Sequence, residues 1–488
     1  MRMTLLIAGL AGAASVAGFA PLHLYPLPIL ALALLFRLWM GCATPGRAAA
    51  AGFAFGLGHF VAGVSWVYVS LHTFGGMPLP LAAFATLAFC AYLALFPALA
   101  GYAVTRIRTN EPLRWLVAGP ALWTLTEWLR GTLFSGFPWL ATGYSQAPDS
   151  PLVQFAPVLG VYGVSLAATA VAGAVALVAQ RTAIRAAVAT AIGVFAAGFG
   201  LGVPAWTTPN GAPVTVSLLQ GNVAQDAKWL PEQLGATLDT YRRLALSTDS
   251  RLIVMPETAV PLFRHEVPEA YLDDLRAHAR RAGGDIAIGM PEGVSRDEYY
   301  NAVFTIGASP EQRYRKSHLV PFGEIIPARA VFGWVLHVLH IPLSDFSRGS
   351  PDQRPLELAG ERVAFNICYE DAFGEEIIRQ LPEATLLANV SNVAWFGDSI
   401  APHQHLQIAR MRAIETGRVM LRATNTGMTA AIDADGRVIA QAAPFTTAVV
   451  TATVQGRAGA TPYVRWGNAA FLLLAALMLL PALRSARR

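Results

Sequence analysis

The chain has few cysteines and little charge for its length. Only three of its 488 residues are cysteines (Cys42, Cys90 and Cys368), so no disulfide framework holds the fold together. Charged residues make up 14% and hydrophobic residues 54% of the chain, which is outside the range of soluble proteins. The net charge of +5 comes without a dense basic run, which argues against a nucleic-acid partner. Because neither a glycine-rich phosphate loop nor a zinc-type spacing occurs, we expect no cofactor and no metal ion.

The composition predicts a protein that contacts lipid, and long apolar runs fill most of its first part. Each run has close to the 20 or so residues that cross a bilayer. The first run has a signal peptide as its alternative, but more runs follow at once and no clear cleavage site appears, which favours a span. We expect eight transmembrane segments: Thr4 to Pro21, Pro26 to Cys42, Ala48 to Leu71, Leu79 to Val104, Trp115 to Leu129, Val161 to Val178, Ala186 to Val203 and Gly467 to Leu483.

Arginines gather in alternate loops, which predicts the orientation of these segments. Arg2, Arg47 and Arg181 lie on the side of the two termini, whereas the loops 22–25 and 72–77 contain no Arg or Lys. Both termini are therefore expected in the cytoplasm, and the polar stretch before the last segment is expected in the periplasm of a bacterium. The predicted domains are a transmembrane bundle over 1–206, a periplasmic catalytic domain over 207–463, and the eighth span with a cytoplasmic tail over 464–488.

The outer loop after the fifth segment is rich in aromatic residues, glycine and proline. Phe137 and Trp139 are expected either to anchor the chain at the headgroup level or to shape an entrance for lipid. Glu127 lies near the outer end of the span, three residues before Arg130 on the same helical face, and the two are expected to pair.

The polar stretch alternates short apolar strands with amphipathic helices. This pattern predicts an α+β domain whose mostly β core is covered by helices. We expect strands at Val214 to Leu219, Leu252 to Met255, Asp285 to Gly289, Ala302 to Ile306, Val363 to Ile367, Thr385 to Asn389, Val419 to Ala423 and Thr429 to Asp433, and helices at Glu232 to Leu244, Glu269 to Arg281 and His403 to Thr416.

Three polar residues follow apolar strands of this domain in a similar way. Glu257 comes after Met-Pro, Lys316 follows a short basic segment, and Cys368 ends the strand that begins near Val363. A carboxylate that takes a thiol proton, a cation that stabilises an oxyanion, and a sulfur nucleophile make a complete set for acyl transfer. For Cys368 taken alone, a buried structural cysteine is the alternative.

The same segments resemble a known superfamily. Glu257 after Met-Pro, Lys316 in Arg315-Lys-Ser-His-Leu-Val-Pro-Phe-Gly-Glu324, and Cys368 in Asn366-Ile-Cys-Tyr-Glu-Asp371 are similar to the Glu-Lys-Cys triad of the nitrilase superfamily. With Thr126-Glu-Trp-Leu-Arg-Gly131 and Gly136-Phe-Pro-Trp139, the whole chain resembles the apolipoprotein N-acyltransferase family of Gram-negative inner membranes. The resemblance implies a multi-pass α-helical membrane domain with a nitrilase-like αββα sandwich.

The resemblance also implies a two-step reaction. Cys368 would take an acyl chain from a phospholipid, typically phosphatidylethanolamine, as a thioester, and the α-amine of a diacylglyceryl-cysteine apolipoprotein would then accept the chain. The expected partners are thus this donor, this acceptor and membrane lipid, and nothing in the sequence demands more than a monomer. Glu257 is the expected general base, and Lys316 is expected to stabilise the oxyanion, together with a backbone N–H near Tyr369.

Further residues are expected to support this chemistry. Glu324 is expected to orient Lys316 or to assist proton transfer, with a surface ion pair as the alternative. Glu370 either positions substrate or pairs structurally. Tyr369 and Asn389 are expected to support the site rather than to react.

The apolar segment 328–343 is expected to lie in the interface as a lid, with Phe332, Trp334 and Leu336 as contacts, or to pack in a core. The resemblance adds Trp229 and Trp395 as residues near the substrate, with a plain surface aromatic as the alternative for Trp229. His403 and His405 lie two residues apart and face different ways on a helix, so they cannot chelate one metal.

Two other functions fit parts of the sequence. A membrane-anchored carbon-nitrogen hydrolase (an amidase or nitrilase) would use the same triad, although one span would be enough to anchor it. A channel or transporter would require polar residues in the middle of its spans, and these spans contain almost none.

Overall fold

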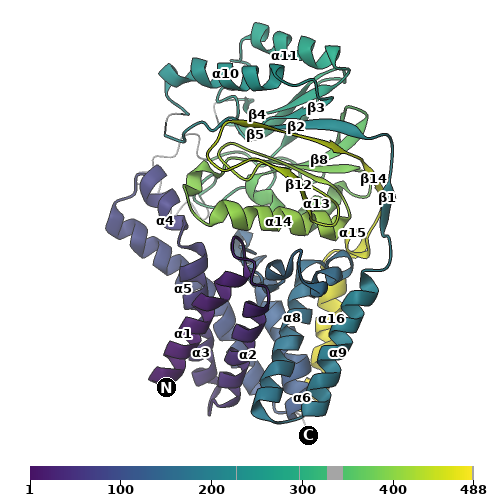
Figure 1. Cartoon of the computed structure of the whole chain (residues 1–488). Coiled ribbons are helices and arrows are strands. Elements are labelled where there is room, and N and C mark those ends of the chain that lie inside the picture. The colour runs from purple at the N-terminus through teal and green to yellow at the C-terminus, as the bar shows by residue number, and fades with distance from the viewer. Residues whose placement is uncertain (227, 296, 327–344, 486–488) are drawn as a thin grey trace. The chain divides into compact units, whose positions relative to one another are not determined.

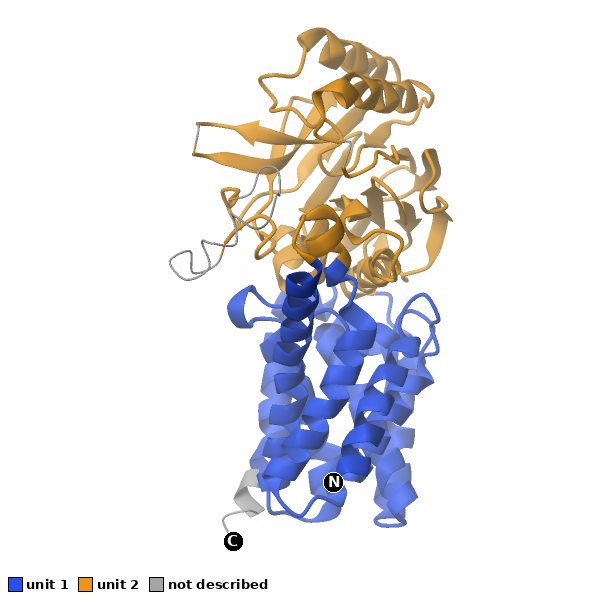
Figure 2. Ribbon diagram, turned by 90° about the vertical axis from the view of Figure 1, so that its left-hand side faces the viewer, with its two compact units in different colours: residues 1–68, 79–205, 461–488 blue, residues 69–78, 206–460 orange. Residues whose placement is uncertain are grey.

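The computed structural model describes residues 1–226, 228–295, 297–326 and 345–485. The chain divides into two compact units, shown in two colours in Figure 2. Unit 1 comprises Met1–Tyr68, Leu79–Ala205 and Thr461–Arg488, and unit 2 comprises Val69–Pro78 and Trp206–Ala460. The predicted lid segment, with Phe332 and Trp334, lies outside the described residues.

Unit 1 is a bundle of helices (Figure 1). Its principal helices are α1 (Arg2–Ser15), α2 (Pro26–Met40), α3 (Pro45–Val64), α5 (Leu79–Arg106), α7 (Gly119–Arg130), α8 (Ala156–Gln180), α9 (Ile184–Leu201) and α16 (Ala469–Ser485). Short helices are α6 (Glu111–Leu113) and α15 (Pro462–Trp466), with η1 (Val16–Gly18), η3 (Arg114–Ala118), η4 (Leu133–Ser135), η5 (Thr142–Gln146) and η6 (Pro151–Phe155). The first helix begins and the last helix ends at the same end of this bundle.

Within the described residues, four helical segments are long and apolar enough to cross a membrane: Pro45–Val64, Leu79–Arg106, Pro151–Gln180 and Ile184–Leu201. The predicted count of eight is therefore not confirmed. Arg2–Gly18, Pro26–Met40 and Ala469–Ala482 are apolar but shorter. The segment expected at 115–129 contains α7, which has 12 residues and so spans only about 18 Å. It continues the π-helix η3 and α6, and Pro120 starts its first turn.

Glycine allows α1 and α3 to approach closely. A Cβ added at Gly12 would lie 1.9 Å from the Phe55 carbonyl oxygen, and one added at Gly58 would lie 2.0 Å from the Gly9 oxygen. Small residues at such crossings bring helix backbones together and increase van der Waals contact, as is common where helices pack in lipid.

Unit 2 is built on two six-stranded sheets (Figure 1). One sheet has the order β13-β2-β3-β4-β5-β6 and the other β12-β11-β10-β9-β8-β7. The strands of the first sheet are β2 (Val214–Gln220), β3 (Leu252–Val254), β4 (Asp285–Gly293), β5 (Tyr299–Gly307), β6 (Arg313–Arg315) and β13 (Ala448–Val454). Those of the second are β7 (Leu356–Leu358), β8 (Glu361–Ile367), β9 (Leu386–Ser391), β10 (Met420–Thr424), β11 (Ala430–Ile432) and β12 (Val438–Gln441), and β1 (Thr207–Pro209) pairs with β14 (Arg457–Gly459).

Apolar residues from both sheets form one buried core between them, including Val216, Val254, Phe365 and Leu421. A second cluster joins the other face of the first sheet to α10 (Pro231–Leu246) and α11 (Glu269–Arg281). Helices α13 (Gly374–Ile377) and α14 (Ala401–Thr416) lie against the other face of the second sheet. Unit 2 is thus an αββα sandwich, and the predicted strands and helices all occur within a few residues of their expected bounds.

A short segment from between two helices of the bundle belongs to unit 2. It contains the π-helix η2 (Ser70–Phe74), which contacts η10 (Val393–Phe396). The Ser70 hydroxyl donates to the Trp395 carbonyl oxygen at 2.7 Å, and the rings of Phe74 and Trp395 lie 6.2 Å apart, edge to face. Trp395, expected near the substrate, is therefore a docking point for this segment.

Candidate active site

Strand ends of both sheets carry the three predicted catalytic residues. Glu257 follows β3 by three residues, and Lys316 and Cys368 come directly after β6 and β8. The Lys316 N–H donates to the Asn301 carbonyl oxygen at 2.8 Å, which extends the pairing of β6 with β5 by one residue. A side chain at the end of a buried strand is held firmly by the sheet, so these positions suit chemistry that requires fixed geometry.

A buried lysine lies between two carboxylates. Lys316 Nζ is 2.8 Å from Glu324 Oε1 and 3.5 Å from Glu257 Oε1, and its side chain is fully buried. The Asn301 amide donates to the same two oxygens, at 2.7 Å to Glu257 and 3.1 Å to Glu324. The N–H of Asn392 donates to Glu257 Oε2 at 2.8 Å. The ion pair of Glu324 with Lys316 therefore lies inside the site and not at the surface, which favours a role of Glu324 at the site.

These contacts determine which groups are charged. Burial alone would raise the pKa of Glu257, but Lys316 and the hydrogen bonds from Asn301 and Asn392 lower it below its ordinary value. Burial disfavours the Lys316 ammonium, yet the carboxylates of Glu324 and Glu257 outweigh burial and raise the lysine pKa. At neutral pH the site thus holds an ionised Glu257 beside a protonated Lys316.

Cys368 is the first residue of η8 (Cys368–Ala372) and has a backbone φ of +54°, in the left-handed region that non-glycine residues seldom adopt. Burial and the charge of Glu257 raise the pKa of its thiol to about 12, against the lowering effect of Lys316. The resting side chain of Cys368 is therefore a thiol rather than a preformed thiolate, and it would need a base to react as a nucleophile.

Glu370 joins the lysine segment to the cysteine segment. Its Oε1 accepts from the Ser317 N–H at 2.6 Å, the Ser317 hydroxyl at 2.9 Å and the His318 N–H at 3.0 Å. Its Oε2 accepts from the Ile367 N–H at 2.7 Å and the Tyr314 hydroxyl at 3.0 Å. Because protein donors occupy both carboxylate oxygens, the structure favours the structural role predicted for Glu370 over substrate positioning.

The other predicted supporting residues are buried. Tyr369 lies edge to face with Phe373, with ring centroids 5.1 Å apart. Asn389 donates to the Cys368 carbonyl oxygen at 3.1 Å. Trp229 is half-buried, but its neighbour Lys228 is the residue in contact with Glu257, since its Nζ lies 3.3 Å from the Glu257 carbonyl oxygen.

Lys228 and Asn301 were not predicted from the sequence. Burial lowers the pKa of Lys228 to about 8, against the raising effect of Glu257, so its charge responds to pH just above neutrality. Neither residue belongs to a motif with a known mechanism, and only the fold places them beside Glu257. Among the residues that the structure describes, no group of three His, Cys, Asp or Glu side chains could hold a metal ion.

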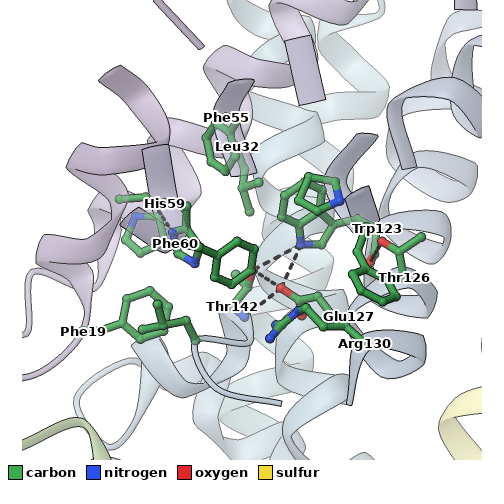
Figure 3. Close-up of a pocket in the computed structure, with 15 residues that line it drawn as sticks. Phe19, Leu32, Phe55, His59, Phe60, Trp123, Thr126, Glu127, Arg130 and Thr142 are labelled. Carbon is green, nitrogen blue, oxygen red and sulfur yellow. Dashed lines mark hydrogen bonds between the residues drawn. The ribbon is translucent and has the colours of Figure 1, made fainter. Parts of the chain in front are cut away.

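Unit 1 contains a separate polar cluster inside its apolar bundle (Figure 3). Glu127 Oε1 accepts from the Trp123 indole N–H at 3.0 Å, and from the N–H and hydroxyl of Thr142 at 2.9 and 2.6 Å. Arg130 donates to the carbonyl oxygens of Phe137 and Trp139, at 2.5 and 2.7 Å. Both residues thus fasten α7 to the loop that follows it, whereas the sequence predicted that they pair with each other.

The cavity beside this cluster measures about 20 Å³, which is room for about one water molecule. Phe19, Phe55 and Phe60 are among the rings that surround it. Trp139 is only 2% exposed and packs against Trp66, with centroids 5.3 Å apart, and Phe137 stacks on Trp139. Trp139 therefore supports the loop from inside the unit and has little surface for lipid.

Both parts of the chain match known protein families. Residues 11–174 match the apolipoprotein N-acyltransferase N-terminal domain, and residues 215–463 match the carbon-nitrogen hydrolase family. An apolipoprotein N-acyltransferase of Nitrosomonas europaea is 57% identical over 96% of this chain and 95% of its own length. Those of Chromobacterium violaceum and Methylococcus capsulatus are 47% and 50% identical, over 99% and 92% of this chain and 94% and 90% of theirs.

The chain belongs to the apolipoprotein N-acyltransferase family. Among solved structures, it is similar to an amidase of the nitrilase superfamily from Nesterenkonia AN1, with 16% identity over 54% of this chain and 97% of that chain and a TM-score of 0.40. The two family matches and the curated relatives confirm the resemblance seen in the sequence over both parts of the chain. As an enzyme of the apolipoprotein N-acyltransferase type, it joins a helical unit to a hydrolase-like sandwich.

Proposed function

We propose that this enzyme transfers a fatty acyl chain from a phospholipid to the N-terminal α-amine of a diacylglyceryl-cysteine apolipoprotein, through a thioester on Cys368. The observation that carries the proposal is the pair of an ionised Glu257 and a protonated Lys316, both of which act electrostatically on the Cys368 thiol. This arrangement provides a base, a cation and a nucleophile, the three groups that acyl transfer through sulfur requires.

In the first step, Glu257 takes the thiol proton as sulfur attacks the ester carbonyl of the phospholipid. The Lys316 ammonium and the Tyr369 N–H stabilise the oxyanion that forms. Collapse of this intermediate breaks the ester bond, and the departing alkoxide takes the proton from Glu257 and leaves as lysophospholipid. Because the thiol pKa is about 12, proton transfer and attack are expected to occur together.

In the second step, the α-amine of the apolipoprotein attacks the thioester. Glu257 accepts a proton from the nitrogen, the carbon–sulfur bond breaks, and Cys368 leaves as a thiolate that recovers the proton. The product is an amide, and the enzyme returns to its starting state. One product leaves before the second substrate reacts, so we expect ping-pong kinetics.

For the membrane part we propose eight crossings of the bacterial inner membrane, with both termini in the cytoplasm and the sandwich in the periplasm. The even count agrees with α1 beginning and α16 ending at one end of the bundle. The three shorter apolar helices and the continuous helical segment from α6 to α7 supply the remaining crossings. We further propose phosphatidylethanolamine as the donor and a monomer as the working form.

A membrane-anchored carbon-nitrogen hydrolase is the second candidate, because residues 215–463 match that family. The two candidates differ in what reacts with the acyl-enzyme. A hydrolase passes the acyl group to water, whereas the acyltransferase passes it to an amine.

Intact mass spectrometry of the purified enzyme after incubation with phosphatidylethanolamine tests the first step. We expect an acyl adduct on the wild type that hydroxylamine removes. The Cys368→Ala variant should carry none, and Cys42→Ala and Cys90→Ala, which keep Cys368, should acylate like the wild type. Addition of a diacylated lipopeptide should discharge the adduct into an N-acyl peptide. Absence of an adduct on folded wild type would refute the proposal, and discharge only to free fatty acid would favour the hydrolase.

A further inference from the structure

Three polar side chains lie in register across the second sheet. Asn366 on β8 is opposite Asn389 on β9, which is opposite Arg422 on β10. Their strand neighbours Phe365 and Leu421 belong to the core between the sheets. Because successive side chains of a strand point to opposite faces, the three polar residues face the helix side of this sheet, where α14 packs.

These residues form a network with Asp371 and His405. Arg422 Nη1 donates to Asp371 Oδ2 at 3.0 Å and to Asn389 Oδ1 at 2.5 Å. His405 Nε2 lies 2.7 Å from Asp371 Oδ1 and 3.3 Å from the Cys368 carbonyl oxygen. Since Asn389 also donates to that carbonyl, the network meets the nucleophile at its backbone.

The charges in this network balance. The side chains of Asp371 and Arg422 are fully buried and compensate each other. Burial and the nearby Arg422 lower the pKa of His405, so its ring is neutral at physiological pH. Both neighbours of Nε2 are acceptor oxygens, so this nitrogen carries the proton and donates. His405 is thus a fixed donor whose tautomer Asp371 selects.

The hydrogen bonds to the Cys368 carbonyl also affect the Tyr369 N–H, which belongs to the same peptide unit. A peptide unit is planar and trans, so the carbonyl of Cys368 and the N–H of Tyr369 point in opposite directions. A donor that holds the carbonyl therefore also sets the direction of the Tyr369 N–H. The positive φ of Cys368 makes this turn costly to maintain without such contacts.

We propose that His405, held by Asp371 and Arg422, is a positioning residue that aims the Tyr369 N–H at the oxyanion. The inference rests on the proposed function, because it assigns this network to the oxyanion step of that reaction. In this role His405 donates a hydrogen bond to the Cys368 carbonyl oxygen, and it neither binds a metal ion nor transfers a proton.

The test separates a reaction that forms an oxyanion from one that does not. Thioester formation with phosphatidylethanolamine passes through an oxyanion, whereas alkylation of Cys368 by iodoacetamide does not. His405→Leu should slow single-turnover thioester formation by about 10- to 100-fold, which is less than the loss of an oxyanion donor costs, because the Tyr369 N–H is misdirected and not removed. Its alkylation rate and its KM for the phospholipid should stay within about twofold of wild type. His405→Gln, whose amide also donates, should restore most of the acylation rate.

His278→Leu is the matched control. His278 is also buried in unit 2 and also binds a backbone carbonyl, with Nε2 2.8 Å from the Thr248 oxygen, but on α11 and away from the nucleophile turn. It should acylate at the wild-type rate per folded molecule. Arg422→Lys provides a second variant, because it keeps the buried charge but cannot reach Asn389 and Asp371 with the same geometry. It should show the same slowing of acylation with unchanged alkylation.

The outcomes are distinct. Wild-type enzyme that forms no thioester would refute the proposed function itself. Wild-type thioester formation with no slowing in His405→Leu, or with equal slowing of acylation and alkylation, would refute the positioning role and leave the proposed function intact. If His405→Leu does not fold, the same comparison in Arg422→Lys decides.

Discussion

Replacement of Asn301 by alanine should change how the rate of Cys368 alkylation depends on pH. Asn301 is buried on β5, and its amide donates to both carboxylates that flank Lys316, with the shorter bond, 2.7 Å, to Glu257. The alanine variant keeps the backbone carbonyl that accepts from Lys316 but removes this donor. Glu257 then keeps Lys316, the Asn392 N–H and Lys228 as the groups that stabilise its charge.

The size of the effect follows from the loss of one charge-assisted hydrogen bond to Glu257. Such a bond stabilises an ionised group by about 1.5–3 kcal/mol. At about 1.4 kcal/mol for each pKa unit, the pKa of Glu257 should rise by about 1 to 2 units. The direction is upward because the lost bond stabilised the charged form. The free energy of unfolding should fall where Glu257 is ionised, and this loss should disappear as the pH falls through the pKa of Glu257 in the folded protein.

The rate of Cys368 alkylation by iodoacetamide, followed by intact mass from acid to neutral pH, measures this shift. In the proposed mechanism ionised Glu257 is the base for the thiol, so the acid limb of the profile should move to higher pH by the same shift of about 1 to 2 units. Thr305→Ala is the control, since Thr305 is buried on the same strand but bonds to Gln312. An acid limb at the wild-type position in Asn301→Ala would refute the assignment of Glu257 as the base.

Three further predictions test other contacts of unit 2. Glu370→Gln places an amide N–H₂ among five donors, so it should lower the free energy of unfolding by about 3 kcal/mol in denaturant titration. Glu375→Gln, at an exposed position, is the control and should leave this free energy unchanged. An unchanged midpoint in Glu370→Gln would contradict the bridging role. Lys228→Met removes a positive charge that lowers the pKa of Glu257, so the acid limb of the alkylation profile should move to higher pH, and a shift to lower pH would contradict this. Trp395→Ala and Phe74→Ala should each lower the melting temperature. A double-mutant cycle should give a coupling free energy of about 1 kcal/mol between the two rings. If the two losses of stability simply add, the ring contact contributes nothing.

Much of the fold was predictable from the sequence because burial imposes local periodicity. The strand before Glu257 is a short apolar run, and in the strand before Cys368 the apolar residues Val363, Phe365 and Ile367 alternate with smaller or polar ones. The reactive side chains that follow these strands marked where each strand ends. The helical bundle followed from composition, but the number of crossings did not. Helix length depends on where packing and proline divide an apolar run, as at Pro120 at the start of α7.

The sequence by itself determined the superfamily and the identity of the three residues proposed for catalysis, since each of these depends on a short contiguous segment. The αββα sandwich followed from the resemblance to that superfamily. Only the tertiary structure decided how these residues are charged and held. Asn301 comes from a strand with no motif, and His405 lies on a helix 37 positions beyond the cysteine whose carbonyl it contacts. Such partners are brought together by strand register and helix packing, which depend on the whole core. No local pattern of residues reports them.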